Sequence, residues 1–149
     1  MKIYFDMDGT LVDLYGVEDW LPKLRAFDPS PYAEAVPLIR FCTLAYYIHK
    51  LQKMGHEVSI ISWLSKDPKV TAEYDEEVTR TKIDYLRRRL PSVWWDTINI
   101  TKPNVPKSTF CEPGAILFDD ESGNREDWTA HGGTAYGVDN ILEILRGLC

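Results

Sequence analysis

The sequence has few cysteines and lacks any long apolar run. Cys42, Cys111 and Cys149 are odd in number and far apart, and none has the CxxC or Cys/His spacing of a zinc site. We therefore expect reduced cysteines without a catalytic task. No apolar stretch approaches the roughly 20 residues that span a bilayer, and no signal-peptide core follows Met1. These absences predict a cytoplasmic protein with no membrane partner.

Basic charge is also scarce. The chain has 17 lysines and arginines against 23 acidic residues, which gives a formal net charge of −6. Nonspecific binding to a nucleic-acid backbone needs a basic face, so we do not expect nucleic acid as a partner. The one basic cluster, residues 87–89, is predicted to lie on the solvated face of a helix. No sequence feature predicts an oligomeric state.

What the sequence does contain is the composition of an ordinary globular domain. Its 149 residues are 44% hydrophobic and 27% charged, which is typical of one domain spanning residues 1–149. Short apolar segments bounded by turn residues predict five buried strands. These segments are residues 2–5, 58–61, 97–100, 115–118 and 134–138.

Helical patterns separate these segments. Residues 34–54, 72–90 and 140–148 carry apolar side chains at spacings of three and four. The alternation predicts an α/β fold, a doubly wound, Rossmann-like parallel sheet of five strands flanked by helices. Residues 12–33 contain several prolines and aromatic residues, too broken for one helix. We interpret them as a small helical cap inserted after the first strand, with a plain connecting loop as the alternative.

Polar side chains stand where the predicted strands end. Asp6 and Asp8 follow the first strand, and Ser62 follows the second. Asp119 and Asp120 follow the fourth strand. In a doubly wound sheet, ligands bind at this edge, near the point where the strand order reverses. Carboxylates gathered there repel one another unless a cation lies among them, and oxygen ligands without histidine or cysteine favour Mg²⁺.

These residues resemble the motifs of the haloacid-dehalogenase superfamily. The sequence DMDGTL at residues 6–11 is similar to motif I, which is DxDGT followed by an apolar residue. Ser62 matches motif II, and residues 119–120 match the acidic motif IV. Motif III is a lysine ahead of the fourth strand. Lys107 fits it better, and Lys102 is the alternative.

The resemblance implies a role for each matching residue. Asp6 would be the nucleophile that forms an aspartyl-phosphate, and Asp8 the general acid and base. Asp6 and Asp8, the latter through its backbone carbonyl, would also be metal ligands. Gly9 and Ser62 would donate hydrogen bonds to the phosphate.

Three further residues complete the implied site. Lys107 would neutralise charge on the nucleophile and on the transferring group, and Asp119 and Asp120 would hold Mg²⁺. An aspartate two residues after the nucleophile, here Asp8, is typical of the family's phosphatases and phosphomutases. A mutase would carry a larger cap, so phosphoester hydrolysis is the predicted chemistry.

The predicted cap lies where the family's small C1 caps are inserted. Residues 118–124, together with Trp128 and the glycines at 132–133, are similar to the cytosolic 5′(3′)-deoxyribonucleotidase branch. Trp63 directly follows motif II, and its ring would either stack on a base or pack within the protein. The sequence thus predicts a phosphatase of a nucleoside monophosphate or another small phosphorylated metabolite. The alternatives are a nucleic-acid end-processing phosphatase and a non-catalytic phosphate-binding module.

Overall fold

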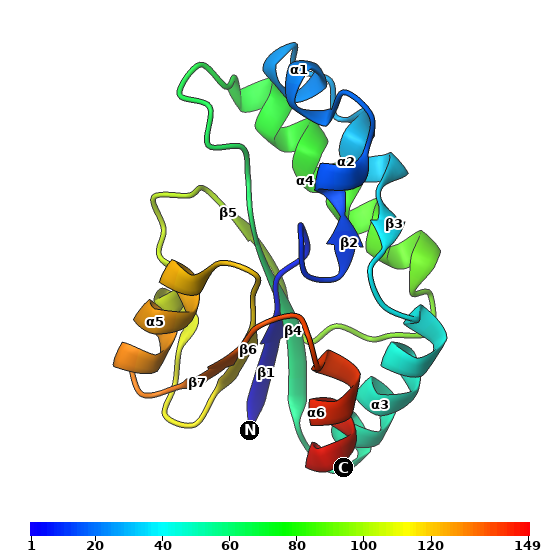
Figure 1. Ribbon diagram of the computed structural model, residues 1–149, viewed down its shortest axis with the longest axis vertical. Helices are drawn as coiled ribbons and strands as arrows, with labels where there is room; N and C mark the ends of the chain where they lie inside the picture. Colours follow the sequence, from blue (N-terminus) through cyan, green and yellow to red (C-terminus); the bar gives the residue numbers. More distant parts are fainter.

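The fold is built on a central sheet of five parallel strands, in the order β5-β4-β1-β6-β7. The computed structural model describes all residues from 1 to 149 (Figure 1). The strands are β1 (Lys2–Phe5), β4 (Glu57–Trp63), β5 (Ile98–Thr101), β6 (Ile116–Phe118) and β7 (Thr134–Tyr136). The predicted doubly wound α/β fold is confirmed. From β1 the chain adds strands on one side and then on the other, so the strand order reverses between β1 and β6.

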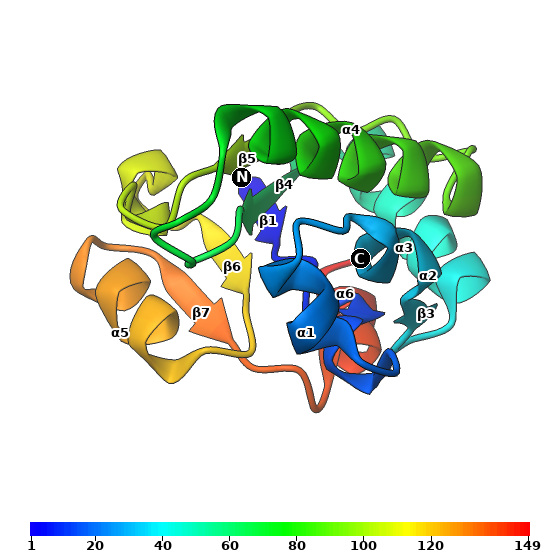
Figure 2. The same cartoon turned by 90° about the horizontal axis from the view of Figure 1, so that it is seen from above.

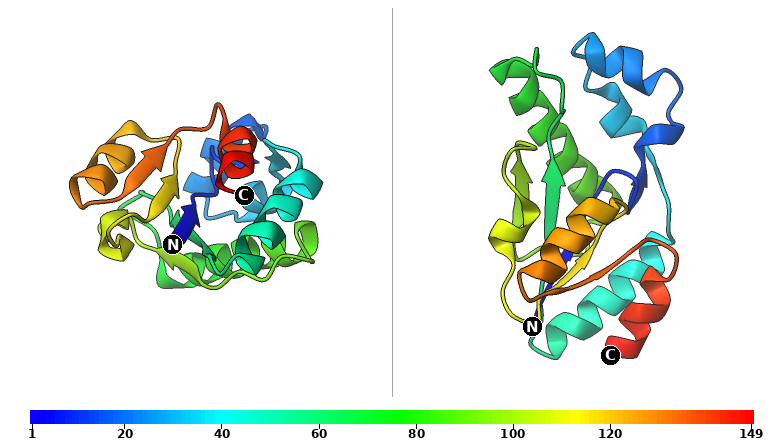
Figure 3. Two further views of the ribbon diagram at one scale, coloured as in Figure 1. Left: turned by 90° about the horizontal axis from the view of Figure 1, so that it is seen from below. Right: turned by 60° about the vertical axis from the view of Figure 1, so that its left-hand side comes forward.

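Both faces of the sheet are covered because side chains alternate along each strand. Ile3 and Phe5 belong to one buried cluster, whereas Tyr4 belongs to another with Trp128. The first face carries α3 (Phe41–Lys53), α6 (Ile141–Leu148) and the second half of α4 (Ala72–Arg89), and the opposite face carries α5 (Ser122–Ala130). Figure 3 shows α3 and α6 side by side, with α5 across the sheet from them.

Two parts of the helix prediction need correction. The helix predicted over residues 34–54 begins only at Phe41, because Val36–Pro37 form the short strand β3. A proline has no backbone N–H and clashes with the preceding turn, so Pro37 is incompatible with a helix interior. Helix α5 was not predicted. Among its nine residues only Trp128 is buried, and one apolar side chain produces no helical period.

Short elements lie between β1 and α3. They are β2 (Val12–Asp13), η1 (Leu14–Gly16), α1 (Trp20–Arg25) and α2 (Ser30–Glu34), closed at the base by the antiparallel pairing of β2 with β3. Below we call residues 12–37 the insertion. Its Leu24 and Tyr32 belong to one buried cluster with Tyr74 and Val78 of α4, and α2 is the helix of the insertion that lies against α4 (Figure 2). None of the helices is long and apolar enough to cross a membrane.

Candidate active site

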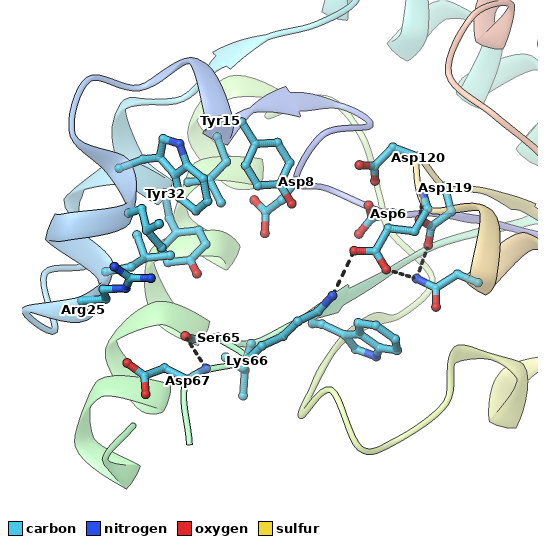
Figure 4. Close-up of a pocket in the computed structure, with 18 of the residues that line it drawn as sticks. Asp6, Asp8, Tyr15, Arg25, Tyr32, Ser65, Lys66, Asp67, Asp119 and Asp120 are labelled. Atoms are coloured by element: carbon cyan, nitrogen blue, oxygen red, sulfur yellow. Dashed lines mark hydrogen bonds and ion pairs between the residues drawn. The ribbon is translucent and has the colours of Figure 1, made fainter. Parts of the chain in front are cut away.

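A cavity of about 760 Å³ separates the insertion from the carboxyl ends of the strands. Asp6 and Asp119 line it from β1 and β6, at the point where the strand order reverses. Tyr15, Trp20 and Tyr32 line it from the insertion. Figure 4 shows Asp6, Asp119 and Asp120 together at one end, with Tyr32 and Arg25 across the pocket and Tyr15 beside Asp8 between them. The volume is that of a small-molecule site.

Three of the predicted acidic residues meet in one cluster. Oxygen atoms of Asp6, Asp119 and Asp120 lie within 4.8 Å of one another. The Thr10 hydroxyl lies 3.0 Å from Asp6 Oδ2 and 3.3 Å from Asp120 Oδ1, and it accepts a hydrogen bond from the Asp120 backbone N–H. Thr10 therefore joins the ends of β1 and β6, which are more than a hundred residues apart in sequence.

The structure places Lys107, and not Lys102, at this cluster. The Lys107 Nζ lies 2.9 Å from Asp6 Oδ1 and 2.6 Å from Asp119 Oδ2, and the side chain is only 3% exposed. Lys102 is exposed and lies 4.0 Å from Asp75, outside the cavity. Lys107 precedes β6 in the η2 turn (Lys107–Phe110), so its position is fixed by a short local element.

Burial controls the protonation of the cluster. The pKa of Asp6 is raised to about 7. Burial is the largest cause, the nearby Lys107 ammonium opposes it, and the Asp8 carboxylate adds to it. Burial likewise raises the pKa of Asp119 and of Asp120. For Lys107, burial lowers the pKa, but the neighbouring carboxylates of Asp6 and Asp119 outweigh it, and the net shift is upward. A buried cluster of this kind is unfavourable when fully ionised and becomes stable when a further cation shares it.

The donor set fits a divalent cation with a preference for oxygen. Two of the three carboxylates, those of Asp6 and Asp119, contact Lys107, and no histidine or cysteine belongs to the group. Asp119 is held rigidly, because its carboxylate accepts hydrogen bonds from Lys107, from the Asn124 amide and from the Glu121 backbone N–H. Such a set of hard oxygen donors fits Mg²⁺.

Gly9 is required by the same geometry. Its φ is +79°, and a Cβ at this position would collide with the Asp120 carboxylate. A residue with a side chain at position 9 is therefore strained and would displace the Asp120 carboxylate. The backbone N–H of Gly9 itself donates to the Val12 carbonyl, 2.8 Å away, which closes the turn after β1. Its predicted hydrogen bond to phosphate stays a prediction.

Ser62 and Trp63 have different surroundings. Trp63 lines the cavity, where its indole N–H donates to the Val105 carbonyl, 3.0 Å away. The ammonium groups of Lys66 and Lys107 lie 5.4 and 5.3 Å from its ring. Ser62 is fully buried just behind the cavity and does not line it. Its predicted hydrogen bond to a phosphoryl oxygen stays a prediction.

Lys82 is the residue that the sequence analysis missed. It lies on α4, is 1% exposed, and places its Nζ 2.8 Å from Asp8 Oδ2. The same nitrogen donates to Ser62 Oγ at 2.8 Å and to the Trp63 carbonyl at 2.7 Å. A signal was present: Lys82 is four residues from both Val78 and Leu86, on the buried stripe of the helix. A lysine on that stripe needs a partner inside the protein.

The fold is similar to that of two solved phosphatase structures. The chain resembles a D,D-heptose 1,7-bisphosphate phosphatase from Burkholderia thailandensis, with a TM-score of 0.61 and 12% identity over 99% of this chain and 97% of that chain. It also resembles the D,D-heptose 1,7-bisphosphate phosphatase from B. bronchiseptica complexed with magnesium and phosphate, with a TM-score of 0.59 and 14% identity over 91% and 79%. No protein-family model and no curated protein matches the sequence.

Proposed function

We propose that the chain is a magnesium-dependent phosphomonoester hydrolase with Asp6 as its nucleophile. The observation that carries this proposal is the contact of Asp6 with Lys107, beside Asp119 and Asp120, in the wall of a cavity of about 760 Å³. One protein with a similar fold is complexed with magnesium and phosphate, which supports the same ligands here. The acidic side chains would bind the metal ion, and the positive charge of Lys107 would offset their repulsion of an anionic substrate.

The first half-reaction transfers the phosphoryl group to the protein. A carboxylate oxygen of Asp6 forms a bond to phosphorus as the bond from phosphorus to the leaving oxygen breaks. Asp8 gives its proton to that leaving oxygen, which departs as an alcohol. The free donor of Lys107 faces the transferring group and offsets its negative charge. Asp6, Asp119, Asp120 and the Asp8 carbonyl would hold Mg²⁺, which would supply Lewis-acid polarisation of the phosphoryl group.

The second half-reaction regenerates the nucleophile. Asp8, now ionised, takes a proton from a water molecule as that water forms a bond to phosphorus. The bond between phosphorus and Asp6 then breaks, and inorganic phosphate and the Asp6 carboxylate are restored. The sum is one ester and one water converted to one alcohol and one phosphate. Both half-reactions require the Asp8 carboxyl group to lie on the side of the phosphorus atom opposite Asp6.

The substrate that we propose is a small phosphorylated metabolite. The motif resemblance and the aromatic lining favour a nucleoside monophosphate: Tyr15 and Trp20 form an edge-to-face pair with ring centroids 5.0 Å apart, and both line the cavity. The two similar structures are sugar-bisphosphate phosphatases, so they favour a sugar phosphate. Relative kcat/KM values on a panel of nucleotides and sugar phosphates separate these substrates, and a clear preference for a sugar phosphate would reject the nucleotide.

The nucleophile is tested by Asp6→Asn. We expect hydrolysis of p-nitrophenyl phosphate that depends on Mg²⁺ in the wild type and a loss of several orders of magnitude in the variant, as for other residues in covalent catalysis. Asp127→Asn is the matched control, because Asp127 is a partly exposed aspartate on α5 outside the cavity. Equal activity of the wild type and Asp6→Asn would defeat the assignment, and inactivity of the wild type on every phosphoester would defeat the proposed function.

A further inference from the structure

The ammonium group of Lys82 has no hydrogen-bond donor left for a substrate. A lysine has three N–H donors and no acceptor. In this structure all three are used, by Asp8 Oδ2, Ser62 Oγ and the Trp63 carbonyl oxygen, at 2.7 to 2.8 Å. Lys82 also does not line the cavity. It is thus oriented toward two predicted catalytic and binding residues and away from the space that a substrate occupies.

The position of Lys82 joins three parts of the fold. It comes from α4, it binds Asp8 after β1, and it binds the end of β4 through Ser62 and Trp63. Its Nζ also lies 4.8 Å from the ring centroid of Tyr32, which belongs to the insertion and lines the cavity. Burying a charged side chain is unfavourable unless the charge is paired and every donor is satisfied. Lys82 meets both conditions only while Asp8 keeps its present orientation.

We propose that Lys82 is a positioning residue that holds the Asp8 carboxylate in line with the leaving oxygen. The inference rests on the proposed function, because it needs Asp8 to be the general acid. The contact fixes Asp8 Oδ2 to the core, whereas Oδ1 makes no hydrogen bond within the protein, and Asp8 lines the cavity. Since Lys82 donates to Ser62 Oγ, the hydroxyl hydrogen of Ser62 stays available as a donor. Lys82 acts through Asp8 and does not touch the substrate.

The test compares two substrates of nearly the same shape on one preparation. p-Nitrophenolate departs readily without a proton, whereas phenolate depends more on the general acid. The quantity measured is kcat/KM, which reports steps up to departure of the leaving group and excludes the later hydrolysis of the aspartyl-phosphate. For Lys82→Met we expect kcat/KM to fall by about 10²-fold with phenyl phosphate, as for a misplaced catalytic group. With p-nitrophenyl phosphate we expect a fall of no more than about threefold, because that step hardly needs the acid.

The ratio of the two values does not depend on how much of the preparation is folded, so partial unfolding of Lys82→Met does not obscure it. Lys82→Gln, which keeps two N–H donors without the charge, gives an intermediate ratio if the donors position Asp8. Lys50→Met removes the same charge from an exposed site on α3 and should leave the ratio unchanged. An equal loss with both substrates, or no loss, overturns the inference while the phosphatase assignment stands. A wild type that hydrolyses neither substrate overturns both.

Discussion

Two buried lysines reach the same edge of the sheet, and their surroundings differ. Lys107 contacts two carboxylates, Asp6 and Asp119, and has one N–H donor free beside the cavity that it lines. Lys82 uses all three donors on Asp8, Ser62 and Trp63. Lys107 is thus placed to act on the transferring phosphoryl group, whereas Lys82 is placed to hold the residues that do. The number of unused donors, and not burial or charge, separates the two roles.

The largest effect that distinguishes the two lysines is expected from Lys107→Met. Its charge should stabilise the transferring group whichever alcohol leaves, so we expect kcat/KM to fall by about 10³-fold with phenyl phosphate and p-nitrophenyl phosphate alike. The ratio of the two values should stay within about twofold of the wild type. Steady-state kinetics on both esters check this. A ratio that changes for Lys107→Met and not for Lys82→Met would invert the comparison.

A smaller effect is expected at Gly9, on the Lys107 side of the site. A Cβ at Gly9 would collide with the Asp120 carboxylate, and the φ of +79° adds strain. We expect Gly9→Ala to raise the Mg²⁺ concentration for half-maximal activity by about tenfold, as for a disturbed ligand environment. The positive φ should also lower the free energy of unfolding by about 1–2 kcal/mol. Titration of activity with Mg²⁺ and chemical denaturation measure the two effects.

Gly114→Ala is the matched control for Gly9→Ala. Gly114 has a φ of +80°, but no atom lies within 4 Å of its added Cβ, and it is outside the cavity. The two variants should therefore lose similar stability from the backbone strain, and only Gly9→Ala should need more Mg²⁺. If both variants shift the Mg²⁺ dependence equally, the effect comes from general destabilisation, and the contact with Asp120 is irrelevant to metal binding.

The sequence predicted one side of this comparison much better than the other. Asp6 and Asp119 directly follow strands, where a local motif and the rules for parallel sheets locate them without any coordinates, and Lys107 lies in a short turn ahead of β6. Lys82 lies in the middle of an 18-residue helix rich in charged residues. Its position four residues from both Val78 and Leu86 indicates that it is buried, but only the packing of α4 against the ends of β1 and β4 shows which groups it binds. The insertion was predicted as broken helical turns. The pairing of β2 with β3 was not predicted, because each strand has only two residues, too few to show the alternation of a strand.

The smallest effect is expected from Lys102→Met, which tests the choice between two candidate lysines ahead of β6. Lys102 is 66% exposed, and its Nζ lies 4.0 Å from Asp75 Oδ2. The lysine is exposed and the distance is long, so this ion pair contributes little, and we expect the free energy of unfolding to change by no more than about 0.5 kcal/mol. Because Lys102 lies outside the cavity, kcat/KM should stay within about twofold of the wild type for both phenyl esters. A loss comparable to that of Lys107→Met would show that Lys102 is the motif III lysine. The free N–H donor of Lys107 would then not be the group that offsets charge on the phosphoryl group.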